Sequence, residues 1–351
     1  MSLPVCDLPR ASAFSDDIQI ILDTLRLGCR NGGIDWQSAC ILYGWHGDVA
    51  CFKRAGAAEG GHVTEKSINP RSGKKWVVPL ACGLLALSLT ANAADLRPQT
   101  LAAFHRYVQL TEAQIDSADA RGEPFLWIDR QTPQRRAAMY AELRAGNAAI
   151  ERLETFDGNG KPVNIPGGLV HQWIGTVFIP GATLAETLDF EEDYDHQAQN
   201  FQPHVQRSQI LRHNGEDYEV LLRFREKKVV TVVLDTVHEV HYVPRDATHA
   251  LSLSYTSRIQ QVDHPGETDE SLEPAGHDDG FLWAMNTDWR FEEKDGGTYV
   301  ECRTISLTRD IPAGLGWLVE PFVTSIPRES LIFTLATTRS ALLRRIANPA
   351  N

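Results

Sequence analysis

Residues 168–181 read Gly-Leu-Val-His-Gln-Trp-Ile-Gly-Thr-Val-Phe-Ile-Pro-Gly, and the apolar pattern of the chain changes its period within this stretch. The part 169–179 is rich in β-branched and aromatic residues, which predicts a strand. A Pro-Gly pair ends it, and Thr183 is available as the N-cap of a helix that we expect to extend to about His196. Helix-like sequence precedes this stretch and strand-like sequence follows it, so a β-rich domain begins here.

Six further strand-like segments follow, rich in Val, Ile, Thr and aromatic residues. Polar turns such as Asn214-Gly215 and the glycine pair at 296–297 separate several of them. The chain then has an apolar segment, 311–326, and a final helix that we expect to begin at Pro327, since proline suits the first helical turn. The strand-like segments are 205–213, 217–226, 228–243, 248–262, 281–293 and 298–309.

Two helix-like stretches lie upstream, at 98–118 and 133–153, on either side of the apolar segment 124–129. In the first of them apolar residues recur at helical spacing. We expect both helices to pack against the domain that follows. The Gly- and Pro-rich segment 157–168 marks the boundary between them and that domain.

This order of elements predicts an α+β fold, in which an antiparallel sheet carries its helices on one face. We expect a curved antiparallel sheet of about six or seven strands around a long C-terminal helix, with an N-terminal helical extension over 94–160. Such a sheet would bury the apolar stripe of the last helix, which consists of Leu331, Leu335, Leu342 and Ile346.

The region 168–347 resembles the START-like helix-grip superfamily (SRPBCC), which includes polyketide cyclase-like and coenzyme-Q-binding proteins. The segment 168–181, Asp193-Tyr-Asp195 and Cys302-Arg-Thr-Ile-Ser-Leu-Thr-Arg-Asp-Ile-Pro312 are similar to exported bacterial members that have no assigned activity. The resemblance implies a hydrophobic pocket between the sheet and the terminal helix. It leaves any reaction open.

Strand alternation nominates residues for this pocket. In 281–293, Trp and Phe side chains alternate with Asn286, Asp288 and Arg290, and Leu251 to Ile259 has a similar apolar face. A Glu-Arg pair at 301 and 303 is either a structural pair or an anchor for a polar ligand group. Close packing into a filled core is the alternative. We expect the ligand cavity to be lined by Trp283, Met285, Trp289, Phe291, Leu253, Tyr255, Glu301, Arg303, Leu331 and Leu335.

No motif indicates catalysis. The region after residue 94 has no Gly-x-Ser-x-Gly and no phosphate-binding glycine loop. His238 and His241 are three apart in a strand, so their rings point to opposite faces, and the acidic run 189–196 lacks the spacing of a calcium loop. Cys302 fits a small buried hydrophobe. We therefore predict no catalytic residue, no metal site and no cofactor.

The first part of the chain has a different character. Five of the six cysteines precede residue 95. Basic residues at 71–75, the uncharged 76–90 and Ala91-Asn-Ala93 are typical of a signal peptide, here 63–93, cleaved after Ala93. We interpret 1–62 as a gene-model extension or a disordered or small helical segment. The remaining 258 residues carry 25 basic and 38 acidic side chains, a net charge of −13, with one cysteine.

These observations predict an exported protein, periplasmic or extracellular, that binds a lipid or another hydrophobic small molecule. An enzyme of the same fold, cyclase-like or hydrolase-like, and an envelope interaction protein with a filled core are the alternatives. The apolar segment 315–323 could be a lid or could contact a membrane surface, or could be a helix on the sheet. The acidic charge argues against nucleic-acid binding.

Overall fold

The computed structural model describes residues 94–227, 231–311 and 316–348, with residues 316–324 as backbone only. The described residues belong to one compact unit. The predicted segments 1–62 and 63–93 lie outside the described residues, and so do the side chains of 315–323.

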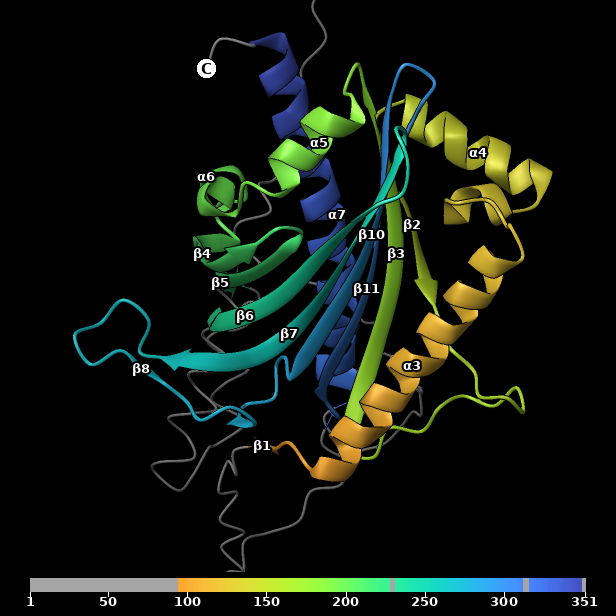
Figure 1. The fold of residues 1–351 in the computed structure, drawn as a ribbon. Helices are drawn as coiled ribbons and strands as arrows, with labels where there is room; N and C mark the ends of the chain where they lie inside the picture. Colours follow the sequence, from red (N-terminus) through yellow and green to blue (C-terminus); the bar gives the residue numbers. More distant parts are fainter. Residues whose placement is uncertain (1–93, 228–230, 312–315, 349–351) are drawn as a thin grey trace, which may run out of the picture. The chain divides into compact units, whose positions relative to one another are not determined.

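The core of the molecule is a strongly twisted antiparallel sheet (Figure 1). Among the described residues it has nine strands in the order β2-β3-β11-β10-β7-β6-β5-β4, with β8 paired to β7. All six predicted segments after residue 204 are strands: β4, β5, β6, β7, β10 and β11. The bounds are β2 Ala149–Leu153, β3 Gly168–Pro180, β4 Val205–Asn214, β5 Asp217–Lys227, β6 Thr231–Pro244, β7 His249–Asp263, β8 Ser271–Leu272, β10 Ala284–Lys294 and β11 Gly297–Arg309. A separate pair joins β1 (Ala94–Asp95) to β9 (His277–Asp278).

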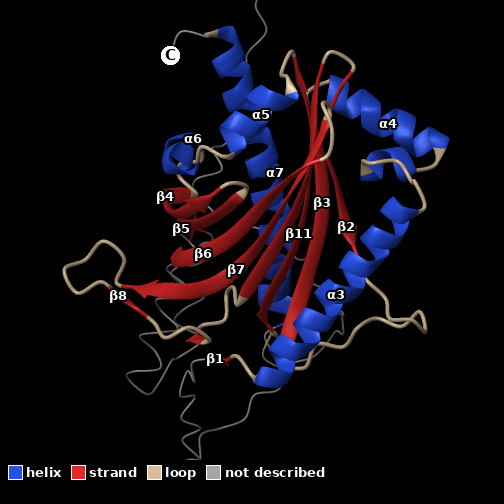
Figure 2. Ribbon diagram, viewed as in Figure 1, coloured by secondary structure: helices blue, strands red, loops and turns tan. Residues whose placement is uncertain are grey.

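The long helix α7 (Gly316–Ala347) crosses one face of this sheet (Figure 2). Leu331, Leu335 and Leu342 are buried in the main apolar cluster, so the predicted stripe of α7 is confirmed as core. Each buried leucine side chain contributes roughly 1.5–3 kcal/mol. We call the sheet face beneath α7 the α7 face. No helix among the described residues is long and apolar enough to span a membrane.

The predicted start of the last helix at Pro327 is wrong, because α7 begins at Gly316 and contains Pro327 in its interior. Proline removes one backbone hydrogen bond from a helix. Packing of an apolar stripe against a sheet stabilises a helix more than propensity does, and it outweighs such a loss.

The helices α3 (Pro98–Ala120) and α4 (Pro133–Arg144) pack on the opposite face, which we call the α3 face (Figure 1). Phe104 and Val108 of α3 are buried against Leu307 of β11. The short helix η1 (Trp127–Arg130) lies between α3 and α4 in the chain, and its Ile128 is fully buried. The predicted packing of the two N-terminal helices against the sheet is confirmed. The prediction that the helices lie on one face of the sheet is wrong, because α7 covers one face and α3 and α4 cover the other.

The second N-terminal helix is shorter than predicted. It ends at Arg144 instead of residue 153, and Gly146 follows with φ +88°, a left-handed conformation that ends helices and favours glycine. The chain then forms β2, which pairs with β3 as an edge strand of the sheet. Residues 149–153 were predicted to be helical, but pairing with β3 makes them a strand of the sheet.

The helix after β3 begins where predicted and ends earlier. Thr183 is the N-cap of α5 (Leu184–Glu191), in a capping box with Glu186. At Asp193 the backbone leaves the helical region, with φ −77° and ψ 57°. Two short helices follow, η2 (Tyr194–His196) and α6 (Gln197–Asn200).

Candidate functional site

Consecutive residues of β10 point to opposite faces of the sheet. Phe291 is buried in the cluster with Leu335 of α7. Arg290 points the other way, and its Nη2 donates to Asp119 of α3 at 2.9 Å. The alternation predicted for this strand holds within β10, and each side of it meets a different helix.

The ten residues predicted to line one cavity are divided between the two faces. Alternation shows which residues share a face and leaves open which helix covers that face. Four of the ten belong to the apolar cluster beneath α7 or pack against it: Trp289, Phe291, Leu331 and Leu335. Met285 lies an even number of residues from Trp289 in β10 and therefore faces the same side. Those on the α3 face are Leu253, Tyr255, Glu301 and Arg303.

Trp283 precedes β10 and belongs to the α3 face as well. Its ring packs in the cluster with Phe104 and Val108 of α3, and its Nε1 donates to Asp278 at 3.1 Å. The helical spacing of the apolar residues in α3 was the sequence signal for this packing. It predicted contact with the sheet, without giving the face.

A β-bulge in β7 divides the apolar face predicted for residues 251–259. Val237 pairs with Arg258 and His238 with Thr256, so Ser257 is an extra residue. After an extra residue, odd- and even-numbered side chains of the strand exchange the faces to which they point. Ile259 therefore shares a face with Thr236, on the α7 side, whereas Leu251 and the residues at 253 and 255 face α3.

Residues that are paired across neighbouring strands form rows on the α7 face, and these rows change from apolar to polar along the strands. The register aligns Ala250, Phe291, Val300 and Val177 in one apolar row. Two rows further, it aligns Ser254, Thr287, Thr304 and Trp173. The next row contains Met285, Ser306 and His171. One part of the α7 face therefore belongs to the apolar core, and the other is lined by hydroxyl and imidazole groups.

Three of these buried hydroxyls have no hydrogen-bond partner among the described residues. They belong to Ser252, Thr304 and Ser306, which are 2%, 9% and 5% exposed. None of the three oxygens is fully enclosed, so each keeps a small accessible surface. Buried polar groups are normally paired with protein or water. These three are therefore available to a ligand or to solvent inside the fold.

The imidazoles on this face are neutral. Burial lowers the pKa of His238 to about 4 and that of His171 to about 4. The Thr236 hydroxyl donates to the Leu222 carbonyl at 3.0 Å, so it accepts from His238 Nε2 at 2.8 Å. His238 therefore carries its proton on Nε2. The ring belongs to a closed hydrogen-bond chain and acts as a structural group.

A buried carboxyl lies at the end of α5. Glu191 is 7% exposed, and burial raises its pKa to about 7. The Thr338 hydroxyl of α7 lies close enough to offset part of this rise, but neither it nor Glu191 Oε1 has a partner in hydrogen-bonding geometry. Sequence analysis missed Glu191, because an acid in a charged run at the end of a helix is usually solvated.

Glu301 and Arg303 do not form the direct pair that the sequence suggested. The Glu301 carboxylate accepts from the backbone N–H of Trp127, at 2.9 and 3.1 Å, and from Thr176 at 3.2 Å. Burial raises its pKa to about 7. The Arg303 guanidinium contacts Asp288 instead, at 3.4 Å. Glu301 therefore fixes the start of η1 on the sheet, which is a structural role.

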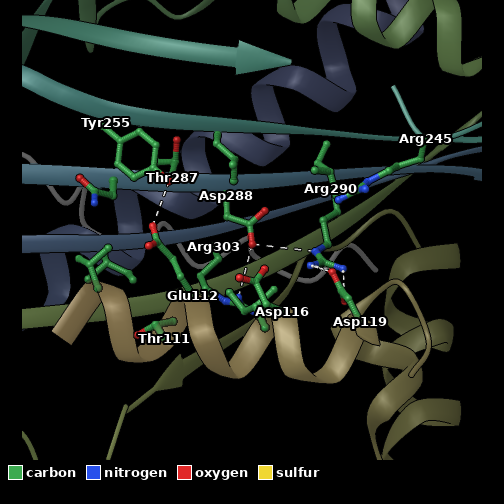
Figure 3. Close-up of a pocket in the computed structure, with 16 residues that line it drawn as sticks. Thr111, Glu112, Asp116, Asp119, Arg245, Tyr255, Thr287, Asp288, Arg290 and Arg303 are labelled. Atoms are coloured by element: carbon green, nitrogen blue, oxygen red, sulfur yellow. Dashed lines mark hydrogen bonds and ion pairs between the residues drawn. The ribbon is translucent and has the colours of Figure 1, made fainter. Parts of the chain in front are cut away.

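A pocket of about 230 Å³ lies between α3 and the sheet, on the α3 face (Figure 3). Figure 3 shows acidic side chains of α3 opposite the arginines of β10 and β11. The lining combines apolar groups with charged ones. Its main members are Val108, Glu112, Ile115, Asp116, Arg245, Leu251, Leu253, Tyr255, Asp288, Arg290, Arg303 and Ile305.

The element order, the antiparallel sheet and the position of α7 across one face match the arrangement implied by the sequence resemblance. The fold is an α+β helix grip, with a large antiparallel sheet and a long C-terminal helix across one face. No protein-family model and no curated protein sequence matches this chain.

Several solved structures are similar to the chain at low sequence identity. Human STARD10 has 11% identity and a TM-score of 0.34, over 61% of this chain and 80% of that one. Zhui aromatase/cyclase from Streptomyces sp. R1128 has 12% identity and a TM-score of 0.37, over 52% and 99%. A fragment of a STAR-related lipid transfer protein from Xanthomonas axonopodis has 17% identity and a TM-score of 0.33, over 51% and 95%.

Within the described part of the chain, no three His, Cys, Asp or Glu side chains converge as metal ligands would. His238 is buried on the α7 face, and His241 is exposed in an ion pair with Asp217. The predicted separation of these two rings is confirmed. Cys302 is a buried free thiol, and burial raises its pKa.

Proposed function

We propose that this START-like domain binds a lipid or another small hydrophobic molecule between its sheet and α7, as a carrier or sensor without a reaction of its own. The observation that supports this most directly is the presence of three buried hydroxyls without partners on the α7 face, those of Ser252, Thr304 and Ser306. A filled core would place apolar side chains there, because an unpaired buried hydroxyl is unfavourable by about 1–3 kcal/mol.

The same face indicates how such a molecule would lie. Its polar group would be near Thr304 and Ser306, which can donate to or accept from it. Its apolar part would extend along Trp289 towards Leu331 of α7, both of which are in or against the main apolar cluster. A ligand that fits this face is mostly apolar with one hydrogen-bonding end.

The most informative experiment is mass spectrometry of molecules extracted from the purified full-length protein. A consistent co-purifying hydrophobe is expected, and its yield should fall several-fold in Ser306→Leu. The control is Ser271→Leu, because Ser271 is exposed on β8. A protein that carries no hydrophobe, and to which no added lipid binds, contradicts the proposal and favours a filled core. Turnover of a bound molecule would instead favour the enzyme.

We also propose that the protein is exported and that its mature form begins at Ala94. The support is the sequence alone: a basic segment, the uncharged 76–90 and the Ala-Asn-Ala site. N-terminal sequencing of the protein secreted by a bacterial host should give Ala94. A protein retained in the cytoplasm with an earlier N-terminus would contradict this.

A further inference from the structure

The pocket between α3 and the sheet is separated from the α7 face by the sheet itself. Its charged groups from the sheet, Asp288, Arg290 and Arg303, lie on α3-face positions of β10 and β11. A molecule bound in this pocket therefore touches the opposite side of these strands from a molecule beneath α7. The pocket is a site of its own.

The group that distinguishes this pocket is the guanidinium of Arg303. The residue is 9% exposed, and its Nε is buried without a hydrogen-bond partner. The only ion pair of Arg303 within the described residues is the 3.4 Å contact with Asp288. An arginine offers five N–H donors, and a buried one normally has most of them paired.

Asp288 is a weak partner because it is shared with a second arginine. Arg290 Nε lies 3.9 Å from the same carboxylate. Arg290 has strong contacts elsewhere, to Asp119 at 2.9 and 3.2 Å and to the Phe125 carbonyl at 2.9 Å. The fold therefore satisfies Arg290, whereas Arg303 has an enclosed, unpaired Nε, one long Nη1 contact to Asp288, and an Nη2 group without a hydrogen-bond partner among the described residues.

The remaining walls suit an apolar body of limited size. Val108, Ile115 and Ile305 line one part of the pocket, and Leu251 and Leu253 line another. At about 30 Å³ per water molecule, 230 Å³ corresponds to roughly eight waters, or a molecule of about eight to ten non-hydrogen atoms.

The rim selects against ligands with several negative charges. Glu112, Asp116 and Asp119 lie along α3, and Asp116 has no hydrogen bond or ion pair among the described residues. Like charges at such distances repel one another. In a phosphate or a dicarboxylate, the second negative charge would lie near these acidic side chains and be repelled by them. A monocarboxylate has only one negative charge, which can pair with Arg303 in a bidentate fashion.

We propose that this pocket binds a small monocarboxylate, with its carboxylate on Arg303 and its apolar body against Ile305, Leu251 and Leu253. The ligand completes the coordination of a buried guanidinium that the chain leaves incomplete. The apolar walls contribute through burial of the ligand body.

Calorimetric titration of the full-length protein with hexanoate and benzoate tests this proposal. Saturable binding is expected for both, and the matched amides, hexanamide and benzamide, should bind at least tenfold more weakly. Arg303→Met should abolish the preference for the acid. The proposal is overturned if acid and amide bind equally, or if neither shows saturable binding. It is also overturned if Arg303→Met binds the acids as the wild type does.

A second variant keeps the test meaningful if Arg303→Met fails to fold. Asp116→Asn removes an exposed acid at the rim, and the affinity for both carboxylates should rise several-fold because repulsion falls. Asp189→Asn is the matched control, since it removes an exposed acid at α5. Equal affinities of the two Asn variants for the carboxylates would contradict the proposed position of the ligand charge.

Discussion

The residue with the clearest consequence for stability is Glu191, a buried acid without an ion pair among the described residues. Its carboxyl is enclosed between α5 and α7, and burial favours the protonated form. Its pKa is therefore about 7 in the folded protein against an ordinary value of 4.5. The fold holds a proton here that the unfolded chain releases.

This difference predicts a pH-dependent effect of Glu191→Gln. Because the folded pKa lies above the unfolded one, Glu191 lowers the stability of the wild type as pH rises from about 4.5 to about 7. Glutamine does not titrate, so the variant should gain stability relative to the wild type over this window. The gain should reach roughly 3 kcal/mol above pH 7.

Urea unfolding at pH 4.5, 6 and 8 measures this difference. The buried histidines affect both proteins equally, so their titration cancels in the comparison. Asp189→Asn, at an exposed position of the same helix, should show no such trend. Parallel pH profiles of the wild type and Glu191→Gln would show that Glu191 is ionised in the folded protein.

At the scale of elements, the N-terminus of α5 depends on its cap. The Thr183 hydroxyl accepts from the Glu186 N–H at 3.2 Å, and Glu186 accepts in return from the Thr183 N–H at 2.9 Å. Thr183→Ala should therefore lower the free energy of unfolding by about 1 kcal/mol. Thr132→Ala is the control, because Thr132 caps α4 without a side-chain hydrogen bond. Similar losses in both variants would contradict a role for the capping box.

The packing of α7 on β3 depends on a residue without a side chain. A Cβ at Gly175 would lie 2.6 Å from Leu335 Cδ1 and would also collide with Ile150 of β2. Gly175→Ala should therefore destabilise the protein by about 1–3 kcal/mol through overpacking, as measured by thermal and urea unfolding. At Gly158 a Cβ meets nothing within 4 Å, so Gly158→Ala should have little effect. An unchanged Gly175→Ala would mean that α7 can move away from β3 at little energetic cost.

At the scale of the whole molecule, an ion pair with a buried arginine joins the N-terminal helix α3 to the sheet. The Arg290 side chain is 4% exposed, and it links β10 to Asp119 of α3 at 2.9 Å. A double-mutant cycle of Arg290→Met and Asp119→Asn in urea should give a coupling of about 1–3 kcal/mol. The exposed pair Arg212–Glu219 should give less than about 0.5 kcal/mol. Equal couplings for the two pairs would mean that the α3 layer is held by apolar contacts alone.

The sequence alone was sufficient for the order of the main elements, with β2 as the exception. The strands β4 to β7, β10 and β11 lie where alternation and turns predicted them, and Thr183 caps α5 as expected. These features are local, because side-chain period and turn chemistry act within a few residues. The helix-grip fold was also expected from the sequence, from its order of strand, helix, strands and helix together with the resemblance of 168–347 to known proteins.

The tertiary structure decided which helix covers each face of the sheet, and hence which predicted residues meet. The sequence analysis assigned Glu301 and Arg303 to the same cavity as Trp289 and Phe291, whereas the folded chain places α3 against the first pair and α7 against the second. The bulge at Ser257 depends in the same way on the register with β6. Such contacts join residues far apart in the chain, so no local pattern encodes them. The sequence alone therefore determined the strands and the fold, and long-range packing determined the site.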